Sequence, residues 1–465
     1  MQLDTQHSDY EVMRPKYEQW EDFYQGGDRV EGKVQYMPRH PYETEKQYKI
    51  RQDRATYRNH AAPIVTVFSS SLWDKTPVRD LPSDIEDLAD DVDRNQTSAD
   101  QFFKSVTDKA ASRGIHFVIV DNPKSQAQTK AEAKVEGVRP YFVDVPATSL
   151  IDWGVDAMGQ LEYIVIYQSV EIGAEPFEGH EYQDQYRLWR KDGWEVWVED
   201  NAADGSKSAR MIDEGVNPLG VIPVVPFLFE KSTEMTGISC LDDVVSLCKR
   251  VFMRDSELDK SLFDSAVEIA CFFGFEADEL DEFLVSSSNG IRSANTDADV
   301  KYVAPTGRAF DALEAAIAND ERSIREIALR MVRPDSKQVE SADSKKEDRR
   351  QLDSQLKRFA QNMSNGETRC WELVAKWMNN QGGEVTITYN DDFDTEQMTT
   401  ELARTFNEMR RNRDISRETF WQILVDNGIL RPEFDPVEEA AKIENEARVN
   451  PAFQNLGAQL NPEEE

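Results

Sequence analysis

The sequence predicts an α+β protein in which a β-rich stretch precedes a mainly helical second half. Between residues 139 and 229, apolar side chains recur with a period of two, as they do in half-buried antiparallel strands. After Pro226 the period changes to 3.6, which is typical of amphipathic helices. The 465 residues leave room for about three domains.

The N-terminal region is predicted to alternate helices and loops before a buried strand. A first helix is expected to end at the pair Gly26-Gly27, because apolar and aromatic residues precede the pair at helical spacing. A second helix is expected over 44–70, and the acidic segment 79–97 is expected to be a surface loop. Ser98 is expected to begin a helix that stops near Gly114, and the apolar run 115–120 predicts a buried strand.

The segment 139–229 carries the strand signals. Strands are predicted over 161–169, 181–190, 193–199 and 221–229, with turns at Asp192-Gly193 and Asp204-Gly205. Three tryptophans of this segment have two interpretations, base stacking or packing within hairpins. Packing is favoured because no basic groove accompanies them. They are Trp189, Trp194 and Trp197.

Two helices in the second half each carry a narrow apolar seam. Helices are predicted over 239–266 and 308–331, with a compact mixed segment, 267–307, between them. The seam residues are Leu241, Val245, Cys248 and Phe252 on the first helix, and Phe310, Ile317, Ile324 and Ile327 on the second. A seam of this width predicts lateral packing of helices. Asp320 interrupts it, which disfavours a long dimeric coiled coil.

The remaining chain is predicted to hold a polar loop and further helices. Almost nothing apolar occurs in 332–346, so an exposed loop is expected, followed by a long helix over 347–380 and a strand over 384–389. Helices are then expected over 395–413, 416–427 and 436–448. The acidic tail 449–465 is expected to be disordered.

The net charge of the chain indicates which classes of partner it can bind. It holds 88 acidic against 54 basic residues, a formal net charge of −34. A protein that coats DNA needs a basic footprint, so this class is disfavoured, whereas passage of DNA without capture remains compatible. Four scattered cysteines predict no disulfide framework. No signal peptide or membrane span is expected, and we expect synthesis in a reducing cytoplasm.

Catalytic motifs are weak. Residues 27–34 fit the spacing of a phosphate-binding loop, but Val34 stands where magnesium binding needs Ser or Thr, and acidic residues lie inside the loop. The acidic run Asp391, Asp392 and Asp394 could hold magnesium, although helix capping explains it as well. We therefore expect that the protein is not an enzyme and that it has no cofactor and no metal site.

An ordered set of short motifs resembles the portal proteins of tailed bacteriophages. The set begins with His7-Ser-Asp9-Tyr10, Trp20 and the run Gln35 to Arg39. It continues with Tyr48, Arg51, Arg54-Ala55 and Asn59, then Phe117 to Pro123, Arg139-Pro140-Tyr141, Ile151-Asp-Trp153 and Ile222 to Phe227. The order helix, insertion, helix, polar loop, long helix is also similar to that family.

The resemblance implies a portal-like division of the chain. Residues 1–238 would form an N-terminal helical segment and an α/β wing. Stem helices 239–266 and 308–331 would flank a clip, 267–307, and a tunnel loop would span 332–346. The long wing helix and returning strand would cover 347–394, a helical crown 395–448, and a disordered tail 449–465.

The resemblance also implies a function and partners. The chain would form a homo-oligomeric ring, usually a dodecamer in this family, at one capsid vertex of the virion. Double-stranded DNA would pass through the ring during packaging and ejection. The terminase large subunit, a head-tail connector and the major capsid protein would be partners, and no membrane would be involved. Another virion structural protein and a packaging-motor enzyme are the alternatives.

Site residues follow from these assignments. The two apolar seams are expected to form the stem interface between ring subunits, because a closed ring joins one face of each subunit to a different face of the next. Connector contacts are expected at Ser287, Asn289, Arg292 and Asp297. DNA contacts are expected at the charged residues of the tunnel loop, namely Arg333, Asp335, Lys337, Glu340, Lys345 and Lys346.

Overall fold

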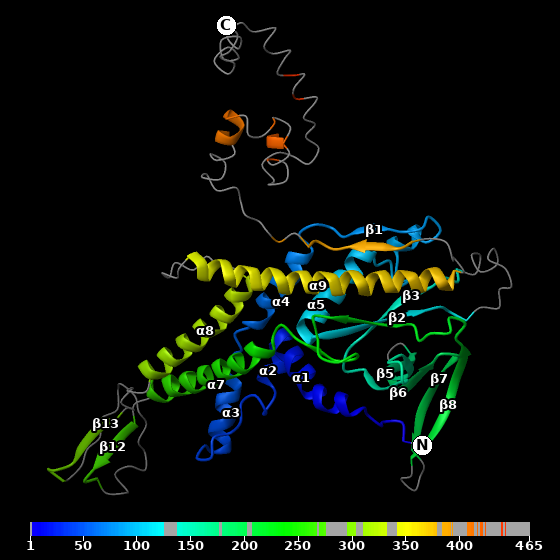
Figure 1. Cartoon of the computed structure of the whole chain (residues 1–465). Coiled ribbons are helices and arrows are strands. Elements are labelled where there is room, and N and C mark those ends of the chain that lie inside the picture. The colour runs from blue at the N-terminus through cyan, green and yellow to red at the C-terminus, as the bar shows by residue number, and fades with distance from the viewer. Residues whose placement is uncertain are drawn as a thin grey trace, which may run out of the picture. The chain divides into compact units, whose positions relative to one another are not determined.

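The computed structural model describes most of the chain up to residue 391. The described ranges are 2–124, 137–175, 179–201, 207–266, 269–275, 295–303, 310–332, 342–378 and 384–391, with residue 393 and short pieces between 407 and 442. The chain divides into two units, residues 1–391 and 392–465. All elements below belong to the first unit (Figure 1). The expected crown helices fall mainly on residues outside the described ranges, and the expected tail lies wholly outside them.

Four helices open the chain: α1 (Ser8–Gln25), α2 (Asp28–Glu31), α3 (Glu45–Arg54) and α4 (Ala61–Leu72). The first helix is confirmed, and Gly26 ends it with a φ of 68°. The expectation of one continuous helix over 44–70 was wrong. The backbone is extended at Ala55, and the Asn59 side chain accepts hydrogen bonds from the N–H groups of Ala61 and Ala62, so that a new helix starts there.

The acidic segment 79–97 is more ordered than a surface loop. It contributes strand β1 (Val78–Asp80), which pairs with β14 (Thr386–Thr388), and the 3-10 helix η1 (Glu86–Asp90). Ile85 and Val92 are buried. The sequence pattern did not reveal these two buried apolar residues, because acidic residues dominate the segment. Their burial packs the segment against the core.

The core of the unit is a three-stranded antiparallel sheet with helices packed on it. Strand β2 (Ile115–Asp121) lies in the centre, between β3 (Tyr141–Val145) and β9 (Val224–Leu228). Every residue of β2 is buried, as predicted. Helices α5 (Ala99–Arg113) and α9 (Ala342–Trp377) contact the sheet. The Ser98 cap and the stop at Gly114 are both confirmed for α5.

A second sheet is a five-stranded antiparallel meander. Its strands are β4 (Leu150–Val155), β5 (Leu161–Glu175), β6 (Gly179–Arg190), β7 (Gly193–Asn201) and β8 (Lys207–Val216), in that spatial order. The hairpin at Asp192-Gly193 is confirmed, whereas Asp204-Gly205 lies outside the described residues. Trp189 is fully buried and its ring lies 6.1 Å from that of Trp194, which favours the packing interpretation.

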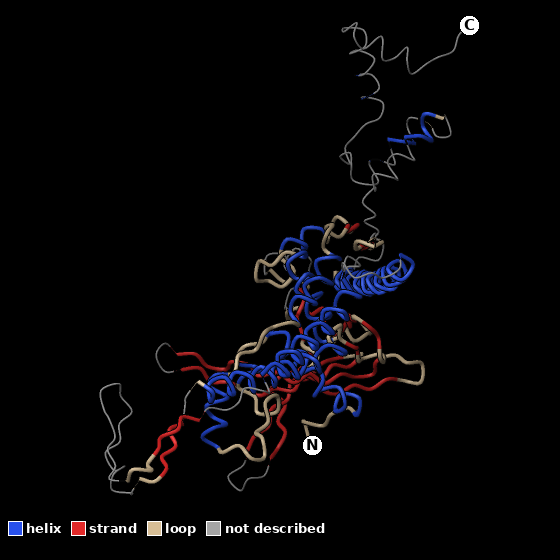
Figure 2. Tube along the Cα trace, turned by 90° about the vertical axis from the view of Figure 1, so that its left-hand side faces the viewer, coloured by secondary structure: helices blue, strands red, loops and turns tan. Residues whose placement is uncertain are grey.

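The C-terminal part of the unit contains two helices, a hairpin and a long third helix. After the short strands β10 (Glu230–Lys231) and β11 (Gly237–Ile238) comes α7 (Asp242–Ser265). Strands β12 (Ile269–Phe273) and β13 (Asp299–Val303) then pair, and α8 (Phe310–Val332) precedes α9. Figure 2 shows the same elements from the side. No helix among the described residues is long and apolar enough to cross a membrane.

The expected loop over 332–346 was too long at its C-terminal end. Helix α9 already begins at Ala342, so Lys345 and Lys346 are helical. Charged and small residues are compatible with a helix even where no apolar face marks it. The strand expected over 384–389 is confirmed as β14.

Candidate functional site

Helices α7 and α8 pack against each other and carry the β12–β13 hairpin at their end (Figure 1). We call α7 and α8 the helix pair. Its apolar contacts are made within the chain. Leu241, Val245, Cys248 and Phe252 are all 2% exposed or less, and Ile317 and Ile324 are 5% and 2% exposed. Phe310 and Ile327 are partly exposed.

This burial corrects the expected ring interface at six of its eight residues, whereas at the partly exposed Phe310 and Ile327 the interface stays a prediction. A side chain that its own subunit already covers has almost no surface left for a neighbour. The six buried seam residues therefore hold the subunit together. A subunit contact made by the helix pair would have to use its other, exposed faces.

Asp320, which interrupts the seam, is the centre of an ionic brace between the two helices. Its side chain is 7% exposed. Arg250 of α7 donates to it from Nε at 2.9 Å and from Nη2 at 2.6 Å, and Arg254 also donates to its carboxylate. Arg254 Nη1 donates further to the Ala316 carbonyl at 3.2 Å. A buried carboxylate needs such partners, and here they join α7 to α8.

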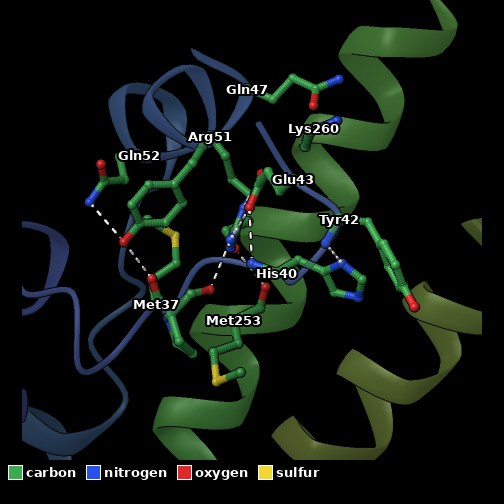
Figure 3. Close-up of polar contacts among 12 residues, drawn as sticks. Met37, His40, Tyr42, Glu43, Gln47, Arg51, Gln52, Met253 and Lys260 are labelled. Atoms are coloured by element: carbon green, nitrogen blue, oxygen red, sulfur yellow. Dashed lines mark hydrogen bonds and ion pairs between the residues drawn. The ribbon is translucent and has the colours of Figure 1, made fainter. Parts of the chain in front are cut away.

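A second brace comes from the N-terminal region (Figure 3). Arg51 of α3 and Glu43 form a bidentate ion pair, with N–O distances of 3.0 and 2.8 Å, and both side chains are 6% exposed. Arg51 also donates to Ser256 Oγ of α7 at 3.2 Å and to the Pro38 carbonyl at 3.0 Å. The hydrogen bond from Arg51 holds the pKa of Glu43 below its ordinary value. Arg51 thus fixes α3 and the loop before it to α7.

Two further arginines extend this brace along the helix pair. The Arg54 guanidinium lies 4.6 Å from the centre of the Phe263 ring, near the end of α7. Arg58 donates to Asp255 of α7 and to Glu321 of α8, each at 3.1 Å. Burial raises the pKa of Asp255 above its ordinary value, and the positive charge of Arg58 opposes that rise. The N-terminal region therefore contacts both helices.

The β12–β13 hairpin leaves apolar side chains in solvent. Phe273, Tyr302 and Val303 are each at least half exposed. The rings of Phe272 and Phe275 pack at 5.6 Å, so these two belong to the internal packing of the segment. Of the expected connector contacts, Asp297 is exposed, and Ser287, Asn289 and Arg292 lie outside the described residues.

The expected DNA-contact residues are mostly not described. Arg333, Asp335, Lys337 and Glu340 lie outside the described ranges. Lys345 and Lys346 belong to the first turns of α9, but their side chains are not described.

A buried polar cluster in the body of the protein was not predicted. Glu367 of α9 is fully buried and accepts hydrogen bonds from Arg79 Nε at 2.5 Å, Tyr389 Oη at 2.6 Å and Trp371 Nε1 at 3.2 Å. Arg79 also pairs with Asp100. Burial raises the pKa of Glu367, although Arg79 and the two hydrogen-bond donors favour the charged form. Arg79 and Glu367 are 288 positions apart, so no local pattern could have revealed the pair.

Nothing in the described chain resembles a metal centre. Among the described residues, no three His, Cys, Asp or Glu side chains are grouped so that they could hold a metal ion. Asp391 is described, whereas Asp392 and Asp394 are not. All four cysteines are free thiols, three of them buried.

Comparison with known proteins gives one family match. Residues 241–378 match the model of a family described as a domain of unknown function, DUF4055. The match begins one residue before α7 and ends one residue after α9, so it covers the helix pair, the hairpin and the long helix. No curated protein matches the sequence.

Several solved structures are similar at low identity. One is titled the virion of a native gene transfer agent particle, with a TM-score of 0.41 at 11% identity, covering 83% of this chain and 95% of that one. Another is the neck of an empty gene transfer agent particle computed with C6 symmetry, with a TM-score of 0.40 at 11% identity, covering 85% and 96%. Scores at this level carry no functional argument.

Proposed function

We propose that the chain is a virion structural protein of a tailed phage or phage-like particle, and specifically its portal protein. Subunits would assemble into a ring at one capsid vertex, through which double-stranded DNA is packaged and ejected. The observation that carries the proposal is the run α7, hairpin, α8, α9 over residues 242–377, in the order that the sequence resemblance implies.

The bracing of the helix pair supports a mechanical role. Asp320 joins α7 to α8, and Arg51 and Arg58 join the N-terminal region to the pair. These contacts fix the two helices relative to each other, while the exposed hairpin remains available for a partner. A ring wall that DNA passes through needs subunits of fixed shape, and two braced helices provide one.

The charge also supports passage in preference to capture. Twelve copies at −34 each would carry 12 × (−34) = −408 formal charges. Carboxylates repel the phosphate backbone, so an acidic wall would favour movement of the duplex over binding.

The test is the assembly state of the purified full-length chain. Negative-stain images are expected to show rings with a central hole, and sedimentation is expected to give a mass several times 53.3 kDa. A monomer at micromolar concentration, or a compact particle without a hole, would contradict the proposal. Substitution of Ile317 or Ile324 by Asp would not test ring formation, because both residues are buried within the subunit and a charge there would disturb its folding.

We propose that the hairpin region binds the head-tail connector. Deletion of residues 285–294 is expected to leave rings intact and to abolish connector binding in a pull-down. This deletion keeps Asn295, whose side chain donates to the Gly274 carbonyl at 3.0 Å and joins the strand ends. Normal connector binding by the deleted ring would refute this assignment.

We also propose that the segment 333–341 meets DNA inside the ring. The double variant Arg333→Ala and Lys337→Ala is expected to assemble normally and to change how much DNA is packaged. Cross-linking from position 337 in DNA-filled heads is expected to give adducts with DNA. Adducts with capsid protein alone would place the segment outside the channel.

A further inference from the structure

A pocket of about 400 Å3 lies between the N-terminal residues and the five-stranded sheet. Tyr10, Arg14 and Glu18 contribute one wall and lie four residues apart on one face of α1. Tyr167 of β5 and Tyr186 of β6 line the pocket from the sheet. We call this site the tyrosine pocket, after Tyr10, Tyr167 and Tyr186. Its volume falls in the range of roughly 300–1,000 Å3 typical of ligand sites.

The strand register places the sheet wall on one side of the β5–β6 pair. Tyr167 and Tyr186 are direct cross-strand partners, and Asp184 stands two residues before Tyr186 on the same strand. Residues two apart on a strand face the same side, so Asp184 adjoins the two rings. The ring centres lie 5.5 Å apart and the ring planes are tilted by 52°, so the two rings adjoin at an angle.

Hydrogen bonds hold the pocket open in one shape. Tyr10 Oη donates to the Thr148 carbonyl at 2.7 Å, and the Tyr167 N–H donates to the Ser149 carbonyl at 2.8 Å. The His7 N–H donates to the Ile151 carbonyl at 2.9 Å, and its ring stacks on Trp153 at 4.0 Å. A ligand would therefore find the walls already in place.

The pocket is acidic. Asp4, Glu18 and Asp184 contribute three carboxylates against one guanidinium, that of Arg14, which already donates to Glu18 at 2.8 Å. The carboxylates act on the tyrosines as well. The hydrogen bond to Asp184 raises the pKa of Tyr167, and burial, followed by the Glu199 and Asp4 charges, raises the pKa of Tyr186 to about 12.

We propose that the tyrosine pocket binds an arginine side chain in an extended segment of a partner protein. A planar guanidinium can stack on the Tyr167 or the Tyr186 ring and donate to the Asp184 and Asp4 carboxylates, which also line the pocket. Among the common side chains, only arginine has a flat cationic group that stays charged at neutral pH and carries five N–H donors. The net charge of −34 favours a basic partner in addition. The inference does not depend on ring formation.

The test uses the tripeptide Ac-Gly-Arg-Gly-NH2 as the probe, with the full-length protein. Its neutral isostere, in which citrulline replaces arginine, is the matched ligand, and spermidine is the competing cation. Calorimetric titration is expected to show saturable binding of the arginine peptide, with citrulline and spermidine each weaker by about tenfold or more. Citrulline keeps the shape and loses the charge, and spermidine keeps the charge and loses the planar face.

Paired variants locate the binding. Asp184→Asn and Tyr186→Leu are each expected to weaken the arginine peptide by about three- to tenfold. Glu162→Gln is the control, since it removes one exposed carboxylate of β5 that does not line the pocket, and it is expected to leave affinity unchanged. Unchanged circular dichroism for all three variants keeps the comparison valid.

Three outcomes would overturn the proposal. One is the absence of saturable binding by the arginine peptide at millimolar concentration. Another is equal loss of affinity in Glu162→Gln and Asp184→Asn, which would mean that only overall charge matters. The third is tighter binding of spermidine than of the peptide, which would make the pocket a polyamine site.

Discussion

We call the β3-β2-β9 sheet, with strands β1 and β14 and helices α5 and α9, the body of the protein. The body and the helix pair are stabilised by different interactions. The body packs aromatic rings around the β3-β2-β9 sheet, where Phe103, Phe142, Phe227 and Trp371 lie within 6 Å of one or more ring neighbours. Its charged pair, Arg79 and Glu367, is almost wholly enclosed. The helix pair is held by a thin apolar seam and by three partly exposed arginines, namely Arg250 and Arg254 of α7 and Arg58 of the N-terminal region.

The difference concerns how each region responds to its surroundings. Packing in the body depends on shape, and its buried charge is shielded from salt. The arginines of the helix pair face water, where salt screens charges with a Debye length of about 10 Å at 0.1 M. The orientation of the helix pair should therefore depend on solution conditions more than the body does. The variants below test this contrast, in order of decreasing expected effect.

Arg79→Met should have the largest effect. It leaves Glu367 enclosed without its cation, and the free energy of unfolding should fall by about 3–5 kcal/mol. Urea denaturation at pH 7 measures the change. Arg29→Met is the control, because Arg29 is exposed on α2, and it should change the free energy by less than about 0.5 kcal/mol.

The same variant should show a distinctive pH dependence. The pKa of Glu367 is already raised in the folded protein, and loss of Arg79 should raise it further. A carboxyl with a raised folded pKa binds its proton more tightly in the folded state, so stability is present at low pH and is lost as the pH rises through that pKa. Arg79→Met should therefore recover stability, relative to the wild type, between pH 7 and pH 5. An unchanged difference would show that the carboxyl is not the cause.

Gly114→Ala should come next. Gly114 has a φ of 81°, and an added Cβ would lie 2.5 Å from the Ile238 carbonyl carbon, in rigid backbone. Strain and overlap together should reduce the free energy of unfolding by about 3 kcal/mol. Gly159→Ala separates the two causes, since Gly159 has a φ of 77° with no atom within 4 Å, and should show strain alone, about 1 kcal/mol. Equal effects would mean that the body adapts to the overlap.

Asp320→Asn should have a moderate effect on the helix pair. The amide keeps the shape but loses the charge that Arg250 and Arg254 bind, so the free energy of unfolding should fall by about 1–2 kcal/mol. Asp311→Asn, at an exposed position of α8, is the control. The difference between the two should shrink in 1 M NaCl. If the difference does not change with salt, the helix pair is no more sensitive to salt than the body, and the proposed contrast between the two regions is wrong.

Glu372→Gln should have the smallest effect. Glu372 pairs with Arg369 on α9 at 2.9 Å, and both side chains are 45% exposed. Exposed pairs of this kind contribute little, so the change should be below about 0.5 kcal/mol by the same urea denaturation. Helix α9 belongs to the body. A larger effect would therefore show that the contribution of an ion pair to stability depends on its region more than on the exposure of its charges.

Local patterns were enough to predict most of the helices and several of the strands. Ser98 and Gly114 mark the two ends of α5, and the apolar run from Ile115 predicts the buried strand, because caps and periodicity act over a few residues. The order from α7 to α9 also followed from the change of period and the polar link. The break at 55–60 was missed, because Asn59 competes with a helical pattern that continues on both sides.

Side-chain contacts across long distances in the chain were decided only by the tertiary structure. The seam of α7 and α8 has the same spacing whether it faces its own subunit or a neighbour, and only packing showed that Ile317 and Ile324 are enclosed within the chain. Arg51 meets Ser256 across 205 positions, and the tyrosine pocket combines α1 with β5 and β6. The sequence by itself determined most of the helices and several of the strands, because those depend on near neighbours. Which carboxylates are enclosed, and which arginine each one meets, depends on how distant segments pack, and the fold alone decides it.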